Sequence, residues 1–299
     1  MTAQVEIIAF TDPYCSWCWA TEPSLMALRE RYRDQIHIRF VMGGLIKDFG
    51  EFYDSLNDIG TPAEVVPHWR MVSERSGQPI DERFWIDVTD PHFSTWPANV
   101  AVKAAGFQSP ELGDRYLRRL RIAVETARAQ ISERDVQLQL AAEVPGLDVA
   151  ALSAELDGER AQLAFESDRD ICAAYGVSGF PTMLFIGNGG ESGQANPALL
   201  VGGHRSTDTY ELVLSKVASG LVKHAPRELE TLLAEYGPLT TRELGEIYGR
   251  SVAEIEPDLR QAAQDGRVVP AELRGGTLWS GLPEVISEPD LIGEALPAY

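Results

Sequence analysis

The sequence predicts an α/β protein of more than one domain. Three observations support this prediction. A strand pattern, a helix pattern and a second strand pattern follow one another at the start of the 299-residue chain. Strand patterns return only near residue 181, after a long stretch of helical patterns. From about residue 224 the chain changes to short helices and one hairpin pattern.

The first unit is a β-α-β arrangement. Residues 5–11 are β-branched and aromatic residues followed by Asp12 and Pro13, which is typical of a buried strand and its end. A helix pattern begins at Cys15, and residues 37–42 alternate between apolar and polar side chains before two glycines. Pro23 interrupts the helix pattern, which nevertheless continues beyond it.

An all-helical insertion is predicted for residues 49–165, where helical stretches such as 96–106 and 114–129 alternate with turn clusters. The strand patterns at 181–186 and 199–202 predict a hairpin, and 210–221 predicts a closing helix. Residues 1–48 and 166–223 are therefore expected to form one domain around the insertion.

The C-terminal residues 224–299 are expected to form a separate, winged-helix-like module of three short helices and a hairpin. The sequence from Thr240 to Glu243 is a capping box, which marks the start of one of these helices. The third helix pattern carries mainly acidic side chains, namely Glu254, Glu256, Asp258 and Asp265 against Arg260. We therefore expect the module to contact a protein partner or a second copy of the chain, because DNA phosphates require basic side chains.

The net charge of −19 argues against general nucleic-acid binding and against binding to anionic membranes. No apolar run approaches the roughly 18 residues of a membrane-spanning helix. The N-terminus has neither a basic start nor an apolar stretch before a cleavage site, so we expect a cytoplasmic protein.

The chain has three cysteines, of which Cys15 and Cys18 form a Cys-x-x-Cys pair. A structural zinc site would need four ligands, and neither a second such pair nor spaced histidines are present. We expect no metal and no cofactor. Cys172 is expected to be a buried structural residue, with a role as a redox relay as the alternative.

The pair is expected to be redox-active because it opens a helix, where unpaired amides and the helix dipole stabilise a thiolate. Cys15 should lie at the exposed mouth and act as the nucleophile, and the more buried Cys18 should resolve the mixed disulfide. The aromatic side chains of Tyr14, Trp17 and Phe180 flank the site and are candidates for contact with an unfolded substrate.

A second part of the site is expected at Gly179-Phe-Pro-Thr182, immediately before a strand. Proline has no amide donor and is therefore suited to a strand start. We expect a cis peptide bond between Phe180 and Pro181, with this loop facing the cysteines.

These motifs, together with Pro23 and the inserted helices, resemble the DsbA-like branch of the thioredoxin superfamily over about residues 5–222. The missing signal makes the chain similar to the cytosolic FrnE-like and SpxH-like members of that branch. The resemblance implies a thioredoxin fold and a disulfide oxidoreductase or isomerase that acts on protein thiols and disulfides. It further implies that Cys15 is the nucleophile, Cys18 the resolving thiol and Pro181 the proline of the substrate groove, with a small thiol as a candidate reductant.

Two alternatives remain open at this point. An SpxH-like adaptor would bind proteins with little redox activity. A kappa-type glutathione transferase shares the inserted helices but uses a single nucleophile position, which fits a pair of cysteines poorly.

The sequence also departs from the family pattern. Ala9 stands where thioredoxins place a buried acid, and Glu22 is the candidate proton shuttle in its place. The residues between the cysteines, Ser16 and Trp17, lack the histidine that would help to hold a thiolate, which indicates a less extreme oxidant.

Overall fold

A four-stranded sheet forms the centre of the protein in the computed structural model, which describes residues 3–55, 57–188 and 196–282. Its strands occur in the order β2-β1-β3-β4. They are β1 (Val5–Thr11), β2 (Ile36–Met42), β3 (Thr182–Gly187) and β4 (Ala198–Gly202). Strand β1 is parallel to β2 and antiparallel to β3, and β4 is antiparallel to β3. The chain therefore forms the predicted β-α-β and β-β-α halves, and its fold is that of thioredoxin.

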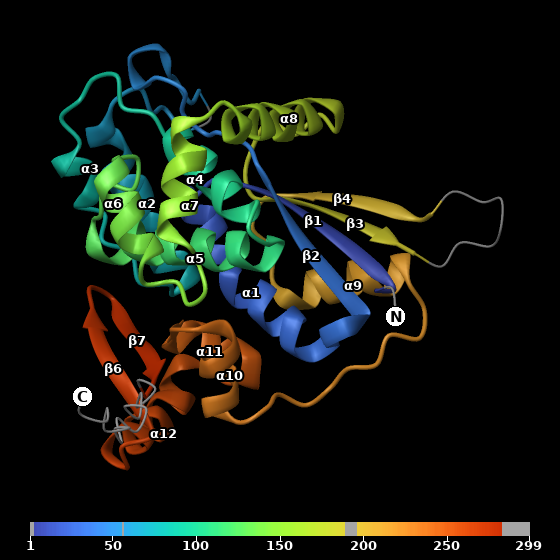
Figure 1. Ribbon diagram of the computed structural model, residues 1–299. Coiled ribbons are helices and arrows are strands. Elements are labelled where there is room, and N and C mark those ends of the chain that lie inside the picture. Colours follow the sequence, from blue (N-terminus) through green and yellow to red (C-terminus); the bar gives the residue numbers. More distant parts are fainter. Residues whose placement is uncertain (1–2, 56, 189–195, 283–299) are drawn as a thin grey trace, which may run out of the picture.

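Helices cover both faces of this sheet (Figure 1). Helix α1 (Ser16–Tyr32), followed by the short helix η1 (Arg33–Gln35), lies on one face together with α9 (Thr207–Val217). Helix α8 (Arg160–Ala174) lies on the opposite face. Successive side chains of strand β1 are buried on opposite faces of the sheet, because Ile7 packs toward α1 and α9 whereas Ile8 packs toward α8. This alternation is the expected period of a strand that is buried on both faces.

The segment between β2 and β3 is helical, as predicted. It contains η2 (Phe49–Glu51), α2 (Pro62–Ser76), α3 (Phe84–Asp87), α4 (Trp96–Gly106), α5 (Pro110–Ala127), α6 (Arg134–Ala141), α7 (Val149–Asp157) and α8. The expected boundary at 165/166 falls inside α8, which is one continuous helix that packs against the sheet. Periodicity could not reveal this, because α8 has the same helical pattern on both sides of the boundary. The division into domains remains a prediction.

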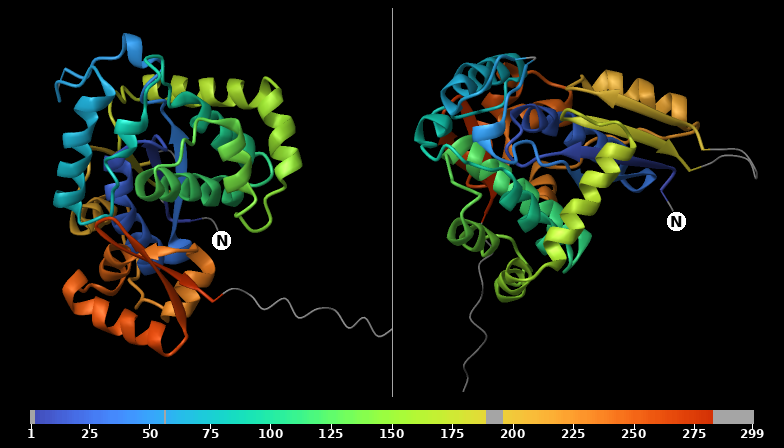
Figure 2. Two further views of the ribbon diagram at one scale, coloured as in Figure 1. Left: turned by 90° about the vertical axis from the view of Figure 1, so that its left-hand side faces the viewer. Right: turned by 90° about the horizontal axis from the view of Figure 1, so that it is seen from above.

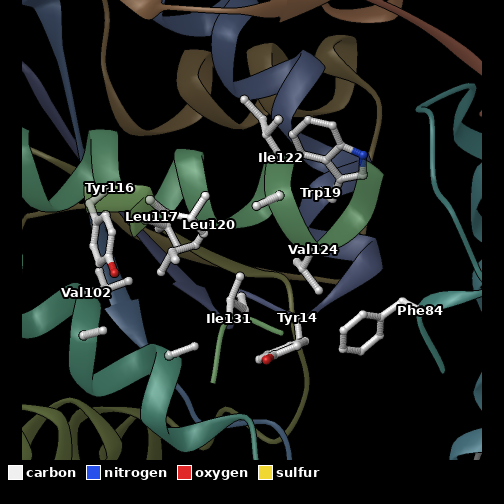
Figure 3. Close-up of a cluster of buried hydrophobic side chains, with 14 of the residues drawn as sticks. Tyr14, Trp19, Phe84, Val102, Tyr116, Leu117, Leu120, Ile122, Val124 and Ile131 are labelled. Carbon is white, nitrogen blue, oxygen red and sulfur yellow. The ribbon is translucent and has the colours of Figure 1, made fainter. Parts of the chain in front are cut away.

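Helix α5 connects the insertion with the helix that carries the cysteines, because Arg118 and Arg121 of α5 are paired with Glu22 of α1. It begins at the N-cap Ser109 with Pro110 in its first turn, and its apolar side packs in the large cluster that also contains Tyr14 and Trp19. Figure 3 shows Leu117, Leu120 and Val124 of this cluster.

The C-terminal residues form the predicted winged-helix-like module. Its elements are α10 (Leu229–Tyr236), β5 (Leu239–Thr240), α11 (Thr241–Tyr248), α12 (Val252–Gln264), β6 (Val268–Leu273) and β7 (Gly276–Gly281). The strands pair in the order β5-β7-β6, so β5 extends the predicted hairpin to three strands. Thr240 and Ser251 each begin a helix with a capping box, which confirms the box predicted from Thr240 to Glu243.

This module packs against α1 (Figure 2), and its separation from the first domain remains a prediction. Met26 of α1 is buried within the module's own hydrophobic core. The segment that leads to the module is also tied down, because Gln35 and Val222 exchange two hydrogen bonds of 2.7 Å. The amide of His224 donates to the carbonyl of Arg31 at 2.8 Å.

None of the helices in the described residues has the length and apolar character that crossing a membrane requires.

Candidate active site

The two thiols lie at the start of α1. Cys15 is the N-cap residue, and the amide of Cys18 donates a hydrogen bond to the Cys15 Sγ at 3.3 Å. The first turn of α1 contains no acidic residue that would oppose a thiolate. A sulfur in this position receives both an orphan amide and the positive end of the helix dipole. The predicted placement of the pair at a helix N-terminus is therefore confirmed.

The loop before β3 reaches the first of these thiols. The peptide bond between Phe180 and Pro181 is cis, as predicted. The Cys15 Sγ donates to the Phe180 carbonyl at 3.5 Å, and the Pro181 carbonyl accepts from the amide of Gly203 at 2.8 Å. The structure thus brings Cys15, Phe180 and Pro181 together from opposite ends of the first domain.

The expectation that Cys15 lies at an exposed mouth is wrong. Cys15 is 6% exposed and Cys18 is 3% exposed, so both thiols are buried. The 180–181 loop lies against Cys15, and the ring of Phe180 packs so closely on Gly43 that a Cβ there would be 1.8 Å from the ring. Sequence reasoning placed a helix N-terminus at the surface and could not foresee that this loop would cover it.

The two thiols differ in their electrostatic surroundings. Burial raises the pKa of Cys15, and its hydrogen bond with Cys18 acts in the same direction. Burial also acts to raise the pKa of Cys18, but the hydrogen bond with Cys15, the guanidinium of Arg121 and the hydroxyl of Thr11 outweigh it and lower this pKa. The buried cation therefore favours a thiolate on Cys18.

Arg121 enters the site from α5 and was not predicted. Its side chain is buried and donates hydrogen bonds to Glu22 and to the Thr11 hydroxyl. A sequence signal existed, because Arg118, Arg121 and Glu125 recur along one side of a helix whose neighbouring positions are apolar. Charged residues next to a buried stripe are usually solvated, and only the packing of α1 on α5 shows that these are buried.

Glu22 is buried rather than solvated. Its two carboxylate oxygens accept hydrogen bonds from Arg121 and from Arg118. The arrangement makes Glu22 the counter-ion of two arginines, and the structure shows no contact of its carboxylate with either thiol. Its assignment as a proton shuttle therefore has no geometric support.

Glu125 is a second buried carboxyl near Cys18, also missed from the sequence. It is fully buried, and neither of its side-chain oxygens has a hydrogen-bond partner among the described residues. Burial raises the pKa of Glu125 well above its ordinary value, against the opposing attraction of Arg121, and the charge of Cys18 raises it further. These surroundings favour the neutral form of the Glu125 carboxyl.

Asp12 ties the segment before the cysteines to the helical insertion. Its buried carboxylate accepts from the Leu45 amide at 2.7 Å, from the Thr95 hydroxyl at 2.9 Å and from the Asn99 amide group at 2.8 Å. It also accepts from the amide of Tyr14 at 2.8 Å. The residue that the sequence indicated only as a strand end thus fixes the position of the redox pair.

Tyr14 is buried away from solvent, which argues against the predicted contact with an unfolded substrate. It is fully buried, and its hydroxyl donates to the Ser132 Oγ at 2.9 Å and accepts from the Ser132 amide at 2.8 Å. Its ring packs beside Phe84 and Phe93. Figure 3 shows it within the cluster of buried side chains rather than at the surface. The inserted helices supply the partners that the sequence could not place.

Trp17, by contrast, is only half-buried. Its ring stacks on His204 with centroids 5.6 Å apart and meets His68 edge-on at 6.4 Å. His204 is held by a 3.0 Å contact between its Nδ1 and the Thr21 hydroxyl, and burial lowers the pKa of both histidines. Trp17, His68 and His204 therefore form a neutral aromatic group beside the two cysteines. The sequence did not predict this group, because its two histidines are far apart in the chain.

A family model described as Thioredoxin matches residues 8–212, which is more than half of the chain. The chain belongs to the thioredoxin family. Within it, this protein has a DsbA-like fold of the SpxH branch. It is 26% identical over 279 residues to a Bacillus subtilis protein named ClpXP adapter protein SpxH, covering 93% of this chain and 89% of the relative. It is 29% identical over 279 residues to the protein of that name from Shouchella clausii, with the same two shares.

Two solved structures share the fold of this thioredoxin-family chain. A putative protein disulfide isomerase from Nitrosomonas europaea has a TM-score of 0.58 and 20% identity, covering 71% of this chain and 97% of the neighbour. The cytosolic disulfide reductase DsbM from Pseudomonas aeruginosa has a TM-score of 0.53 and 24% identity, with the same coverage. Both likenesses cover a smaller share of the chain than the SpxH relatives do.

Cys172 of this thioredoxin-family protein lies away from the pair. It is buried in a hydrophobic cluster with Ile8, Val41 and Leu184 beneath α8. Burial raises the pKa of its thiol to about 11. These surroundings are those of a structural cysteine.

Proposed function

We propose that this protein is a thiol–disulfide oxidoreductase or isomerase that acts on protein disulfides through Cys15 and Cys18. The observation that carries the proposal is the pair itself: two neighbouring thiols at the start of α1, one of them beside Phe180 and the other stabilised by Arg121. A cytoplasmic location forms part of this proposal, and the cytosolic neighbour DsbM supports it.

The chemistry requires no metal or further cofactor. In the reducing direction, Cys15 passes its proton to the Cys18 thiolate with which it shares a hydrogen bond, and the resulting Cys15 thiolate attacks one sulfur of a substrate disulfide. The substrate S–S bond breaks, and the other substrate sulfur leaves as a thiolate, which takes the proton from Cys18. Cys18 then attacks the Cys15 Sγ, which releases the second substrate thiolate and leaves a Cys15–Cys18 disulfide. Two electrons pass from the protein to the substrate, and a small thiol restores the dithiol. The oxidising direction is the reverse.

The roles of the two cysteines follow from position and charge. Cys15 is the less buried of the two and lies beside the Phe180–Pro181 loop, so it is proposed as the residue that meets the substrate. Cys18 lies deeper, and its lowered pKa suits a resolving thiol that must attack as a thiolate. The backbone of Phe180 is proposed to pair with an extended substrate segment, with Pro181 setting the loop and Trp17 contributing an aromatic surface.

Reduction of insulin by a small thiol, with Cys15→Ser and Cys18→Ser variants, tests this proposal. The wild-type protein should accelerate reduction, and both variants should lose the acceleration. Only Cys18→Ser should accumulate a mixed disulfide with substrate, because it retains the attacking thiol but cannot resolve it. Equal background rates for all three proteins would contradict an enzymatic role.

A protein-binding adaptor is the second candidate, and the similarity to SpxH over nearly the whole chain favours it. An adaptor would deliver a regulatory protein to a protease of the ClpXP type. Loss of both thiols would then be tolerated, so the Cys15→Ser/Cys18→Ser double variant should support ClpXP degradation of the delivered protein as well as the wild type does. Dependence of that degradation on the thiols would instead join the two functions.

A further inference from the structure

A continuous chain of buried charges connects the C-terminal module with the redox pair. It consists of Glu243 in α11, Arg118 in α5, Glu22 in α1 and Arg121 in α5, and we refer to these four side chains as the buried charge chain. All four are buried and their charges alternate in sign. The last member, Arg121, is the cation that lowers the pKa of Cys18.

The module's end of the chain is firmly held. Arg118 donates from both terminal nitrogens to the two oxygens of Glu243 at 2.9 Å, which is a bidentate pair. One of these nitrogens also donates to Glu22 at 3.3 Å, and the other donates to the carbonyl of Pro238. Two contacts of Arg118 therefore come from the module and one comes from the helix that carries the cysteines.

The redox end depends on how Glu22 is shared. Glu22 accepts from Arg118 through one oxygen and from Arg121 through the other. A carboxylate placed between two guanidiniums divides its attraction between them. When Glu243 holds Arg118 strongly, Glu22 interacts less with Arg118 and more with Arg121. The positive charge of Arg121 is then compensated more fully by Glu22, and Arg121 stabilises the Cys18 thiolate less.

We propose that Glu243 is a positioning residue for Cys18, acting through the buried charge chain, so that docking of the C-terminal module tunes the redox pair. This inference rests on the proposed function, because it concerns the same thiols. The module is then a built-in partner of the active site, and the coupling is reciprocal: the redox state of the pair must alter how firmly α11 is held.

Other ionisable groups near Cys18 also belong to its environment. They are Cys15 and Asp12 before α1, Arg121 and Glu125 on α5, and Tyr210 on α9. None of these lies in the module. A change made at Glu243 can reach Cys18 through the buried charge chain, through long-range attraction, or through Gln78, whose amide group donates to Glu243 at 3.5 Å and to the carbonyl of Trp19 at 3.3 Å.

Glu243→Gln is the variant that tests the proposal. Glutamine keeps the size and the capping function at the third position of α11 but removes the charge. The thiolate absorbance of the reduced full-length protein is titrated against pH. Without the charge at position 243, Arg118 should interact more strongly with Glu22, and Arg121 should interact more strongly with the Cys18 thiolate. The midpoint pH of the thiolate titration should therefore fall by roughly 0.4–1.5 pH units, the range expected for coupling along such networks.

Glu254→Gln is the matched control, because Glu254 occupies the same capping-box position in α12 but is exposed and lies outside the buried charge chain. Its midpoint should equal that of the wild type, since solvent screens its charge.

Combining Glu243→Gln with Arg118→Met separates positioning from long-range attraction. The double variant loses one charge of each sign, so long-range attraction alone would return the midpoint to the wild-type value. If Glu243 acts by positioning, the titration midpoint of the double variant should lie above that of the wild type. Glu22 would then interact with Arg121 alone within the buried charge chain, and Arg121 would stabilise the Cys18 thiolate less. The proposal would be overturned by a folded Glu243→Gln protein with a wild-type midpoint, or by a double variant whose midpoint equals that of the wild type or that of the single variant.

A second measurement needs no variant and decides the matter if Glu243→Gln fails to fold. Amide hydrogen exchange of the wild-type protein is compared between the dithiol and disulfide states. Exchange in α11 should differ between the states while exchange in α12 stays the same, and identical exchange in α11 would overturn the proposal. Neither measurement uses a protein substrate, so each reads the coupling even if the insulin assay shows no turnover.

Discussion

At the scale of single residues, the site depends on charges that have been moved out of water. Arg121 and Glu22 form an ion pair, whereas Glu125 is buried with no partner for either oxygen among the described residues. An unpaired buried carboxyl is costly, and it lowers that cost by remaining protonated. Such groups are more frequent at functional sites than in ordinary cores, where an apolar side chain would serve better.

Glu125→Gln should make the protein more stable at alkaline pH. The folded pKa of Glu125 lies above its unfolded value of about 4.5, so the folded state keeps a proton that the unfolded state loses as pH rises. The free energy of unfolding of the wild type therefore decreases as the pH rises above 4.5, whereas that of the variant does not decrease for this reason. Urea unfolding at pH 8 should show a gain of roughly 1–3 kcal/mol that shrinks toward pH 4.5.

The control for this change is Glu166→Gln, an exposed position on α8 that accepts a hydrogen bond from Gln162. Its effect should be small at both pH values. A pH-independent effect of Glu125→Gln would show that the carboxyl is not held in its neutral form.

Gly43→Ala should displace Phe180 from the site. An added Cβ would lie 1.8 Å from the Phe180 ring, although the backbone of Gly43 is not in the left-handed region. We expect a loss of roughly 1–3 kcal/mol in the free energy of unfolding, as for other overpacked positions. The double variant Gly43→Ala/Phe180→Ala should recover most of it, because the three atoms nearest to the added Cβ all belong to that ring.

Gly106→Ala in α4 is the matched control, since its added Cβ would contact nothing within 4 Å. It should be neutral or slightly stabilising. A Gly43→Ala protein that is as stable as this control would mean that the Phe180 ring moves freely, and its place beside Cys15 would then have no structural support.

At the scale of elements, α1 links the sheet, the insertion and the C-terminal module. Its first turn carries the thiols, its middle carries Glu22, and its last turns carry Glu30, which is fully buried beside the segment leading into α10. Glu30 accepts three hydrogen bonds from the guanidinium of Arg227, the shortest at 2.6 Å, and another from the Tyr236 hydroxyl. One helix therefore anchors the module at two buried carboxylates.

Glu30→Gln should weaken this anchor in a pH-dependent way. Burial acts to raise the pKa of Glu30, but the hydrogen bonds and charge of Arg227 outweigh it and lower the pKa below 4.5. The carboxylate therefore contributes stability above pH 4.5, and that contribution is lost as pH falls through the folded pKa. Thermal unfolding should place the variant roughly 1–3 kcal/mol below the wild type at pH 7, with the difference narrowing under acid.

An equal deficit at pH 7 and pH 3 would contradict a charge-based anchor. Glu256→Gln, which breaks an exposed ion pair with Arg260 in the same module, is the control and should change little at either pH.

The elements themselves were largely predictable from the sequence. The strand at residues 5–11 and the helix at 96–106 have the predicted bounds, because their apolar spacing and their turn residues agree with the final packing. The buried charges were not predictable. Arg121, Glu125 and Glu243 lie on helices with ordinary amphipathic patterns, and their burial depends on three segments that meet only in the folded chain.

At the scale of the whole molecule, the C-terminal module is held against the redox domain by the buried charge chain and by the apolar contact around Met26. Its α12 contributes Ile255 and Leu259 to the apolar core that receives Met26. The acidic side chains of α12 lie outside the buried charge chain, and the basic side chain of Arg260 is paired with Glu256 and Glu272. We therefore expect α12 to be a surface for a protein partner rather than for nucleic acid. An oxidoreductase whose thiols sense such a module could combine the two candidate functions.

Equilibration of the full-length protein with glutathione buffers of graded potential, followed by mass mapping of the cysteines, tests the central claim most directly. The account predicts one reversible two-electron transition that joins Cys15 to Cys18, leaves Cys172 as a thiol, and has a midpoint more negative than the roughly −120 mV of a strong oxidant. A protein that forms no Cys15–Cys18 disulfide at any potential, or one that pairs Cys172 instead, would contradict it.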